Sequence, residues 1–481
     1  MNAFSWTAVL ILLVIWTISR YRNLCRSMLL ALRLPGPPAW PIIGNILHVT
    51  DTKAQFELAN NVSQFAPVVR VWIFLLPTIL VYQPDHLKLI LSSTKVAEKN
   101  YFYQLLQTFI GNGIIMSTGD KWKKNRKLIQ PMFQLGQVER YFEDFARTAE
   151  TVFRSLHTQK HWQITRIVNN CVVNILHKTI LGVDLGPEDE TPFRKGELLI
   201  IKRILKPWLL LDSIFKLSDM SRTESRHKHD LHFYVKKVLA ERKEKLLNKN
   251  GKKCFLDNLI ELQASGDLPE EDVVNEAVTF MLAGQDSVAT GVATCLFYLA
   301  KHQDVQKKVH EEILEILQGS KDQTLKLQDV NEMRYLEQCV KETLRLAPSV
   351  PLIARVLTKD VALDSLTIPT GTNIFVSPYA THHLPEIYPE PSKFNPDRFS
   401  SENIKKIHPF GYLPFSIGPR NCIGYKFAYL EMKTIVATVI RNYHLTLRHE
   451  EDELKLSYRI SLRAKGGIWL NVQSRNLLQE D

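Results

Sequence analysis

One cysteine lies in a segment whose residue types and spacing could hold a metal ion through a thiolate. Residues 415–424 read Phe-Ser-Ile-Gly-Pro-Arg-Asn-Cys-Ile-Gly, with Cys422 at the eighth position and Arg420 two residues before it. The two glycines allow a tight backbone turn and the close approach of a flat ligand. Apolar residues at helical spacing follow, so we expect the sulfur just ahead of a helix N-terminus, where a thiolate is stabilised. The alternative is a buried, inert cysteine, the usual role of a single cysteine.

A charged pair and a second arginine precede that cysteine in the chain. Residues 341–345 read Lys-Glu-Thr-Leu-Arg, so Glu342 and Arg345 are three residues apart and share one face of a helix. Residues 394–399 read Phe-Asn-Pro-Asp-Arg-Phe and form a proline-stiffened loop that carries Arg398. Taken separately, the first pattern predicts a surface ion pair and the second merely a loop.

A tryptophan and an arginine lie four residues apart much earlier in the chain. Residues 122–126 read Trp-Lys-Lys-Asn-Arg. On a helix, Trp122 and Arg126 project from one face, and their N–H groups can bind a carboxylate. An exposed, basic end of a helix explains the same residues equally well.

In their order along the chain and in their rough spacing, the four patterns resemble those of the cytochromes P450, whose haem iron is bound by a cysteine thiolate. The resemblance implies the fold of that family, mainly α with a small β-rich region, and a non-covalent haem b whose iron is bound by Cys422. It also implies that Glu342, Arg345 and Arg398 form a buried triad that braces the haem loop, because buried charges must be paired. The cofactor-binding residues that it implies are Trp122, Arg126, Ala283, Arg355, Phe415, Arg420 and Cys422, with Trp122 and Arg126 at one haem propionate and Arg355 at the other.

The residues expected to act in the reaction lie on a long helix. Residues 280–290 read Phe-Met-Leu-Ala-Gly-Gln-Asp-Ser-Val-Ala-Thr. Ala283 and Gly284 remove side-chain bulk, which lets a ligand approach the backbone, although a notch for helix packing gives the same pattern. By the resemblance, Asp286 and Ser287 are the catalytic acid–alcohol pair that relays protons to oxygen. The family commonly has threonine at the position of Ser287, and serine lacks the methyl group that restricts the rotamer.

Residues 341–355 and 414–424 look most like the fourth P450 family and its insect relatives. Many of those proteins carry a glutamate where Ala283 stands, and that glutamate can bond covalently to a haem methyl group. Alanine cannot do so, which predicts a haem held non-covalently. It also weakens any assignment to hydroxylation of the terminal carbon of fatty acids.

The hydropathy pattern predicts one large globular unit behind a short leader. The chain has 481 residues, and no low-complexity linker or repeat occurs between Thr50 and Val472. Helical patterns are strongest at residues 273–301 and 305–317. Alternation typical of strands occurs at residues 68–75, 360–375 and 468–472. The sequence therefore predicts a mostly helical body with a minor sheet-rich region.

The first residues have the pattern of a membrane anchor. Residues 3–18 are nearly all apolar, and four arginines follow between residues 20 and 33. Positive charge after the apolar stretch places that side in the cytosol, whereas a cleaved secretory signal would carry its charge before it. We predict a single-pass anchor at residues 1–19, a basic and proline-rich linker at 20–45, and a catalytic domain at 46–481. The expected location is the endoplasmic reticulum membrane, with the catalytic domain on the cytosolic side.

The formal net charge of +11 favours contact with an anionic surface. No interleaving of aromatic and basic residues supports nucleic-acid binding, so a membrane and an acidic electron donor are the better partners. The lysines that the family fold would bring near the thiolate side are Lys121, Lys123, Lys124, Lys127, Lys426 and Lys433. The six cysteines are scattered without a Cys-x-x-Cys pair, which does not predict disulfides.

Residues near the substrate can be placed by the resemblance alone. Residues 101–116 are expected over the haem, 206–220 at a membrane-facing entrance, and 348–355 and 458–462 along the pocket. The apolar residues of 206–220 are equally consistent with ordinary packing. None of these residues identifies a substrate.

The predicted function is monooxygenation, a hydroxylation or epoxidation of a lipophilic small molecule such as a fatty acid, a hormone-like lipid or a xenobiotic. NADPH supplies electrons through the flavins of NADPH-cytochrome P450 reductase, with cytochrome b5 as a further partner. One alternative is a haem-thiolate isomerase or dehydratase that acts on lipid peroxides without a reductase. Asp286 and Ser287 argue against it, because such enzymes commonly lose this pair. The other is a non-catalytic haem- or lipid-binding protein, which should lose either this pair or the triad.

Overall fold

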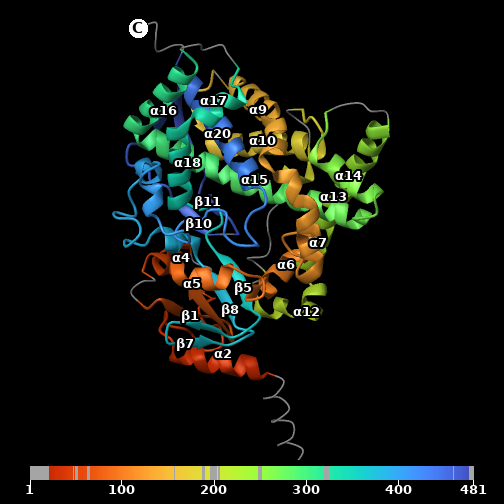
Figure 1. Ribbon diagram of the computed structural model, residues 1–481, viewed down its shortest axis with the longest axis vertical. Coiled ribbons are helices and arrows are strands. Elements are labelled where there is room, and N and C mark those ends of the chain that lie inside the picture. Colours follow the sequence, from red (N-terminus) through yellow and green to blue (C-terminus); the bar gives the residue numbers. More distant parts are fainter. Residues whose placement is uncertain are drawn as a thin grey trace, which may run out of the picture. The chain divides into compact units, whose positions relative to one another are not determined.

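The chain forms two compact units, each built from segments distant in sequence (Figure 1). The first unit comprises Met1–Phe102, Leu352–Pro389 and His408–Asn421, and the second comprises Tyr103–Pro351, Glu390–Ile407 and Cys422–Asp481. The structure, a computed structural model, describes residues 21–46, 48, 52–61, 65–156, 158–186, 190–194, 203, 206–247, 252–318, 324–458 and 460–475.

A five-stranded sheet forms the centre of the first unit. Its strands, in spatial order, are β1 (Val68–Ile73), β2 (Leu76–Val81), β8 (Asn373–Val376), β5 (Ile353–Leu357) and β3 (Ala97–Glu98). Strands β2 and β8 are parallel and the other pairs are antiparallel. Figure 1 shows the early strand β1 in the same sheet as the later strands β5 and β8. The valine and isoleucine content of β1 and β2 favours extended backbone, because β-branched side chains pack well on a pleated surface.

Helices α2 (Arg22–Arg33), α4 (Thr52–Asn60), α5 (Pro84–Leu91) and α19 (Pro378–His382) and the hairpin of β6 (Val361–Leu363) and β7 (Leu366–Ile368) complete this unit. Helix α2 lies within the segment predicted as a linker and packs against β2. Its Ser27 Oγ lies 2.6 Å from Thr372 Oγ1, and its Arg26 forms a 2.7 Å ion pair with Asp360. Residues 22–33 of the predicted linker are therefore a docked helix, a feature that their composition did not predict.

The second unit is mostly helical. Its helices are α6 (Tyr101–Ile110, from Tyr103 onward), α7 (Gly119–Ile129), α8 (Leu135–Val138), α9 (Phe142–Arg154), α10 (Ile164–Leu176), α12 (Asp212–Lys216), α13 (Asp219–Leu247), α14 (Phe255–Ala264), α15 (Glu270–Lys301), α16 (Gln303–Ile316), α17 (Leu327–Glu332), α18 (Arg334–Leu346) and α20 (Tyr425–Asn442). Strands β4 (His161–Gln163), β12 (Trp469–Ser474) and β9 (Tyr443–Leu447) form one small sheet, and β10 (Leu456–Tyr458) and β11 (Leu462–Ala464) form a hairpin. The predicted mixture of a helical body and a minor β region is confirmed.

Helix α15 runs through the core of this unit and packs against α10, α18 and α20 (Figure 1). Its residues 273–281 and most of 288–300 are buried, but residues 282–287 keep accessible surface. A helix that is apolar almost all round is expected in a core. The accessible stretch at its centre is the exception, and it is the stretch that was predicted to carry the chemistry.

The predicted anchor at residues 1–19 lies outside the described residues. Within the described part of the chain, no helix combines the length and the apolar character needed to cross a membrane.

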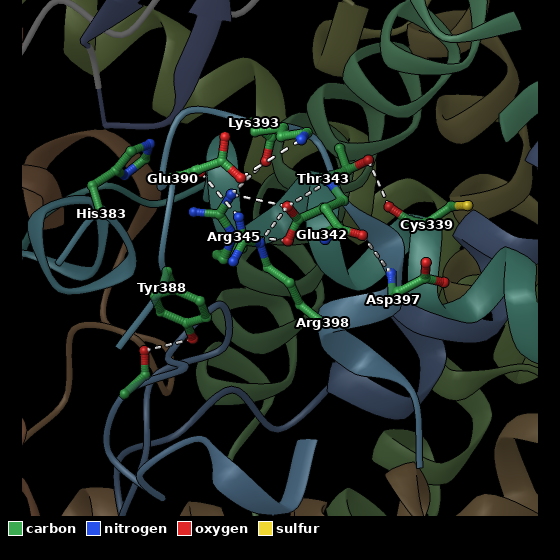
Figure 2. Close-up of polar contacts among 12 residues, drawn as sticks. Cys339, Glu342, Thr343, Arg345, His383, Tyr388, Glu390, Lys393, Asp397 and Arg398 are labelled. Carbon is green, nitrogen blue, oxygen red and sulfur yellow. Dashed lines mark hydrogen bonds and ion pairs between the residues drawn. The ribbon is translucent and has the colours of Figure 1, made fainter. Parts of the chain in front are cut away.

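The predicted triad of Glu342, Arg345 and Arg398 is confirmed (Figure 2). Arg345 Nε donates to Glu342 Oε2 at 2.7 Å and its Nη2 donates to Oε1 at 2.9 Å, while Arg398 Nε lies 3.4 Å from Oε1. The side chains of Glu342 and Arg345 have no exposed surface, and that of Arg398 is 11% exposed. The simpler alternative of a surface ion pair is therefore wrong.

The carboxylate of Glu342 also positions a segment distant in sequence. The Asn395 N–H donates to Glu342 Oε1 at 2.9 Å, and Arg345 Nη2 donates to the Lys393 carbonyl at 3.2 Å (Figure 2). Arg398 Nη2 donates to the Glu390 carbonyl at 3.0 Å. The buried charges of the triad thus hold the segment 390–398 against the end of α18.

We expect Glu342→Ala to lower the free energy of unfolding by about 3–5 kcal/mol, because it leaves buried guanidinium groups without their carboxylate. Denaturant unfolding and the haem content of the purified protein measure this loss. The matched control is Glu311→Ala, which breaks the ion pair between Glu311 and Lys307. Their side chains are 59% and 76% exposed, so this substitution should lower the free energy of unfolding by less than about 1 kcal/mol. Full haem content and unchanged unfolding, with turnover alone reduced, would show that the triad has a chemical role instead.

Candidate functional site

Cys422 differs from the other cysteines that the structure describes. It is exposed, whereas Cys171, Cys254, Cys295 and Cys339 are buried and Cys25 is half-buried. Burial among surrounding protein atoms nevertheless raises the pKa of the Cys422 thiol above 9.0, and the Gly424 N–H and Arg126 act in the opposite direction. The thiol thus lies deep in the protein while keeping accessible surface. The alternative of a fully buried, inert cysteine does not describe it.

The position of the sulfur relative to α20 is as predicted. Gly424 is the N-cap of α20, which begins at Tyr425, three residues after Cys422. A helix N-terminus presents unpaired N–H groups and a partial positive charge, both of which favour an anion. The apolar face of α20 is buried, so packing in the core fixes the start of the helix and, with it, the sulfur.

The two glycines of residues 415–424 have different roles. Gly418 has φ +81°, and a Cβ there would lie 2.0 Å from the carbonyl oxygen of Leu91. No other residue fits that turn without displacing the backbone. Gly424 has φ −93°, and the nearest atom to a Cβ is 3.8 Å away on Phe133. Its backbone therefore needs no glycine, and a Cβ there would make an ordinary van der Waals contact with Phe133.

Three basic side chains converge in the first unit. Arg420 Nη2 donates to Glu98 Oε2 at 3.1 Å, and Arg355 on β5 is 3% exposed. Burial, followed by the charges of Arg355 and Arg420, lowers the pKa of Lys99 well below 10.5, while Glu98 opposes this shift. A site where cations repel one another in this way fits a bound anion.

Sequence reasoning found Arg355 and Arg420 but missed Lys99. Lys99 follows directly after the short strand β3, whose partner is β5, and this pairing aligns Glu98 with Val356. The pairing of β3 with β5 therefore brings Lys99 close to Arg355. No motif connects these positions in the sequence, so only the strand pairing could have indicated it.

In the second unit, α7 carries Trp122 and Arg126. Trp122 is buried and Arg126 is half-buried. Burial lowers the pKa of the Arg126 guanidinium and the nearby Cys422 raises it, which places this arginine beside the thiol. The alternative of an exposed basic helix end applies to the other face of α7, where the lysines lie.

A buried carboxyl group attaches α7 to α15. Glu276 Oε1 accepts a hydrogen bond from Asn125 Nδ2 at 2.9 Å, and Oε2 accepts one from the Ile114 N–H at 3.0 Å. Glu276 has no exposed surface. Burial raises its pKa to about 7, against the effect of both hydrogen bonds. Glu276 was not predicted from the sequence, where it looks like any acidic residue near a helix start.

At the centre of α15, one small residue is accessible to a ligand and the next makes room for a neighbouring helix. Ala283 is exposed, which suits the approach of a ligand. A Cβ on Gly284 would lie 3.0 Å from Leu176 of α10, so the packing notch is the correct interpretation of that residue. Ser287 Oγ donates to the Ala283 carbonyl at 2.7 Å, and Asp286 forms a 2.6 Å ion pair with Arg463.

The lysines predicted to form one basic face are not equivalent. Lys433 is buried and lies 3.4 Å from Glu337, so it is part of the interior rather than of a docking face. Lys121 pairs with Asp272 at 2.6 Å and Lys123 with Asp120 at 3.0 Å. Lys124 and Lys127 are exposed on the same helix.

These residues fit the group that the sequence suggested. The second unit offers an accessible thiol at a helix N-terminus beside an arginine, and an exposed alanine on an otherwise buried helix. The first unit offers the basic side chains of Lys99, Arg355 and Arg420, and Arg355 and Arg420 lower the pKa of Lys99 by their charge, after the larger effect of burial. A thiolate ligand and cationic groups are the donors that an iron porphyrin with two propionates requires.

Comparisons with known proteins point the same way. A family model described as Cytochrome P450 matches residues 34–470. The chain is 41% identical over 490 residues to a probable cytochrome P450 4aa1 of Drosophila melanogaster, covering 98% of this chain and 96% of that protein. It is 32% identical over 468 residues to cytochrome P450 4V2 of Mus musculus, covering 91% and 89%. It is also 32% identical over 514 residues to cytochrome P450 4c3 of Drosophila melanogaster, covering 99% and 95%.

The raised pKa of Glu276 predicts a pH-dependent stability. Its carboxyl ionises near 4.5 in the unfolded chain and near 7 in the folded protein. Between these pH values the unfolded state loses a proton that the folded state keeps, so the free energy of unfolding falls as the pH rises and stays lower above pH 7. Glu276→Gln removes this term, worth about 3 kcal/mol at 1.36 kcal/mol per pKa unit.

The measurement is denaturant unfolding of the wild type and Glu276→Gln at several pH values from 4.5 to 8. Relative to the wild type, the variant should gain stability as the pH rises to 7. The exposed Glu271 on the same helix is the control, because Glu271→Gln should leave the pH dependence unchanged. Parallel curves for the wild type and Glu276→Gln would contradict the assignment.

Proposed function

The chain belongs to the cytochrome P450 family, and on that premise we propose that it is a membrane-attached monooxygenase that takes electrons from NADPH through a flavoprotein reductase and oxidises a lipophilic small molecule. As a member of this family it is an oxidoreductase of the P450 monooxygenase type and uses haem. The observation that carries the proposal is the accessible thiol of Cys422 at the start of α20, beside Arg126.

Each group of residues has a proposed task. Cys422 is the iron ligand, and bound haem supplies the site of O₂ activation, where thiolate donation favours O–O cleavage. Trp122 and Arg126 hold one propionate, and Arg355 and Arg420 with Lys99 hold the other. Phe415 and Ala283 are proposed to contact the porphyrin, the latter without a covalent bond. Asp286 and Ser287 move protons towards the oxygen-binding side.

The proposed redox partner is NADPH-cytochrome P450 reductase, with cytochrome b5 as a second donor. The exposed lysines of α7 support this assignment, because a basic surface attracts an acidic partner and accelerates encounter. Lys124 and Lys127 are exposed on α7. The ion pairs of the described residues involve Lys121 and Lys123 of this helix but neither of these two lysines.

Membrane attachment is proposed through two elements. One is the anchor predicted at residues 1–19. The other is the segment formed by the 3₁₀ helix Pro207–Leu210 and by α12, which exposes four large apolar side chains. These are Trp208, Leu211, Ile214 and Leu217, exposed by 54%, 61%, 41% and 81%. An apolar patch of this kind on a surface marks a protein or membrane contact. The proposed location is the endoplasmic reticulum membrane.

The proposed function is tested with the full chain in lipid vesicles, reductase and NADPH. The reduced protein should form a carbon monoxide complex with the red-shifted Soret band of thiolate ligation. Cys422→Ala should lose that band and all NADPH-dependent turnover of lipid extracts, because no other group replaces the thiolate. Cys25→Ala is the matched control, and it should keep both.

Two outcomes would contradict parts of this proposal. Product formed from lipid peroxides without reductase would favour an isomerase, and a thiolate band without any turnover would favour a binding protein.

Acidified organic solvent should also extract all haem, because Ala283 offers no carboxylate. Haem that stays with the polypeptide would contradict the non-covalent assignment.

We expect deletion of residues 1–20 to leave a folded, haem-binding protein with less membrane attachment. Deletion of residues 1–32 should instead destabilise the protein, because it removes α2, whose Ser27 and Ala31 are buried. Flotation with vesicles measures attachment, and thermal unfolding measures stability. Replacing Trp208, Leu211 and Leu217 by serine in the shorter deletion should abolish the remaining flotation. Unchanged flotation after both changes would show that neither element binds the membrane.

A further inference from the structure

Both carboxylate oxygens of Asp286 are bound by one hairpin. Asp286 Oδ1 lies 2.6 Å from Arg463 Nη2, and Oδ2 accepts a hydrogen bond from Ser461 Oγ. Ser461 comes directly before β11, and Arg463 is the second residue of that strand. Ser461 and Arg463 reach one carboxylate together, while Leu462 between them is fully buried.

The hairpin is attached to α15 by a second route. The Leu462 N–H donates to the Ser349 carbonyl at 2.9 Å, and Ser349 Oγ donates to the Ser287 carbonyl at 2.8 Å. Adjacent residues of α15 are thus linked to adjacent residues of β11 by separate bonds. This closed ring of contacts fixes the orientation of the Asp286 carboxylate with respect to its own helix.

The acid and the alcohol have different partners among the contacts described. Ser287 Oγ donates within α15, to the Ala283 carbonyl at 2.7 Å. The ion pair between Asp286 and Arg463 is partly open to water, with side chains 29% and 38% exposed. Asp286 is therefore in contact with solvent, and Ser287 is the next residue of α15.

From this geometry we infer that Arg463 and Ser461 are positioning residues for proton delivery: they hold the Asp286 carboxylate where it takes protons from water and passes them to Ser287. The inference rests on the proposed monooxygenase function.

Reduction of O₂ to peroxide takes two electrons, from one NADPH, and two protons. Reduction of O₂ to two waters takes four electrons, from two NADPH, and four protons. Slower proton delivery therefore releases more oxygen as peroxide.

The experiment measures NADPH, O₂ and peroxide with the haem-loaded protein and reductase, without added substrate, in H₂O and in D₂O. A positioned proton donor contributes about 10²–10⁴-fold. Because Arg463→Gln keeps the donor and loses its positioning, we expect it to lower the ratio of water to peroxide by about tenfold. It should also enlarge the solvent isotope effect on NADPH oxidation. Arg463→Lys keeps the positive charge and should restore most of both values. Ser461→Ala, which removes one hydroxyl, should give a smaller change in the same direction.

The control is Lys465→Gln, which removes a positive charge from an exposed residue just beyond the same strand. It should leave both values at the wild-type level. A merely structural role of Arg463 would lower the amount of active enzyme without changing the solvent isotope effect of the molecules that remain. An unchanged isotope effect in both Arg463→Gln and Ser461→Ala, or an equal change in Lys465→Gln, would overturn the inference.

Failure of the proposed function is recognised separately. In that case the wild type itself would oxidise NADPH no faster than Cys422→Ala. A wild type that turns over normally, together with an Arg463→Gln variant that behaves like it, rejects the positioning role alone.

Discussion

A carboxylate without exposed surface must have its charge neutralised by neighbours, and Glu342 imposes this requirement on the second unit. Arg345, one helical turn further along α18, binds both of its oxygens. A further hydrogen bond comes from the backbone of Asn395, and Arg398 lies 3.4 Å from the same oxygen, so a segment some fifty positions later in the chain is held at the helix end. A buried pair of this kind adds little net stability compared with apolar packing, but breaking it is costly. Its contacts join segment 390–398 to the end of α18.

Features governed by short-range patterns could be predicted from the sequence. The helix after Cys422 follows from apolar residues at helical spacing, and α20 begins three residues after the cysteine as required. The long helix α15 and the strand β1 follow from hydrophobic periods of 3.6 and two residues. The triad was predicted by family resemblance, because neither Glu342 nor Arg398 shows in the sequence that it will be buried.

Features that depend on which segments meet in the folded chain could not be predicted. Lys433 has the same type and spacing as an exposed helical lysine, yet it is buried against Glu337. Arg463 lies in a short strand with no recognisable motif, and only the fold brings it to Asp286. The same holds for Gly284, where sequence allowed either a ligand or a neighbouring helix, and the neighbour proved to be Leu176. In each case the deciding contact is distant in sequence, where hydrophobic periodicity carries no information.

The cationic group of Lys99, Arg355 and Arg420 has a consequence for the life of the protein in a cell. Burial, and then the charges of Arg355 and Arg420, lower the pKa of Lys99, so an anion that binds beside these groups stabilises the folded chain. A ligand that binds only the folded state raises the folded population by mass action, and unfolded molecules are removed continuously by proteases. The steady-state amount of this polypeptide should therefore follow the supply of haem, and cells starved of haem should contain less of it even when its synthesis is unchanged.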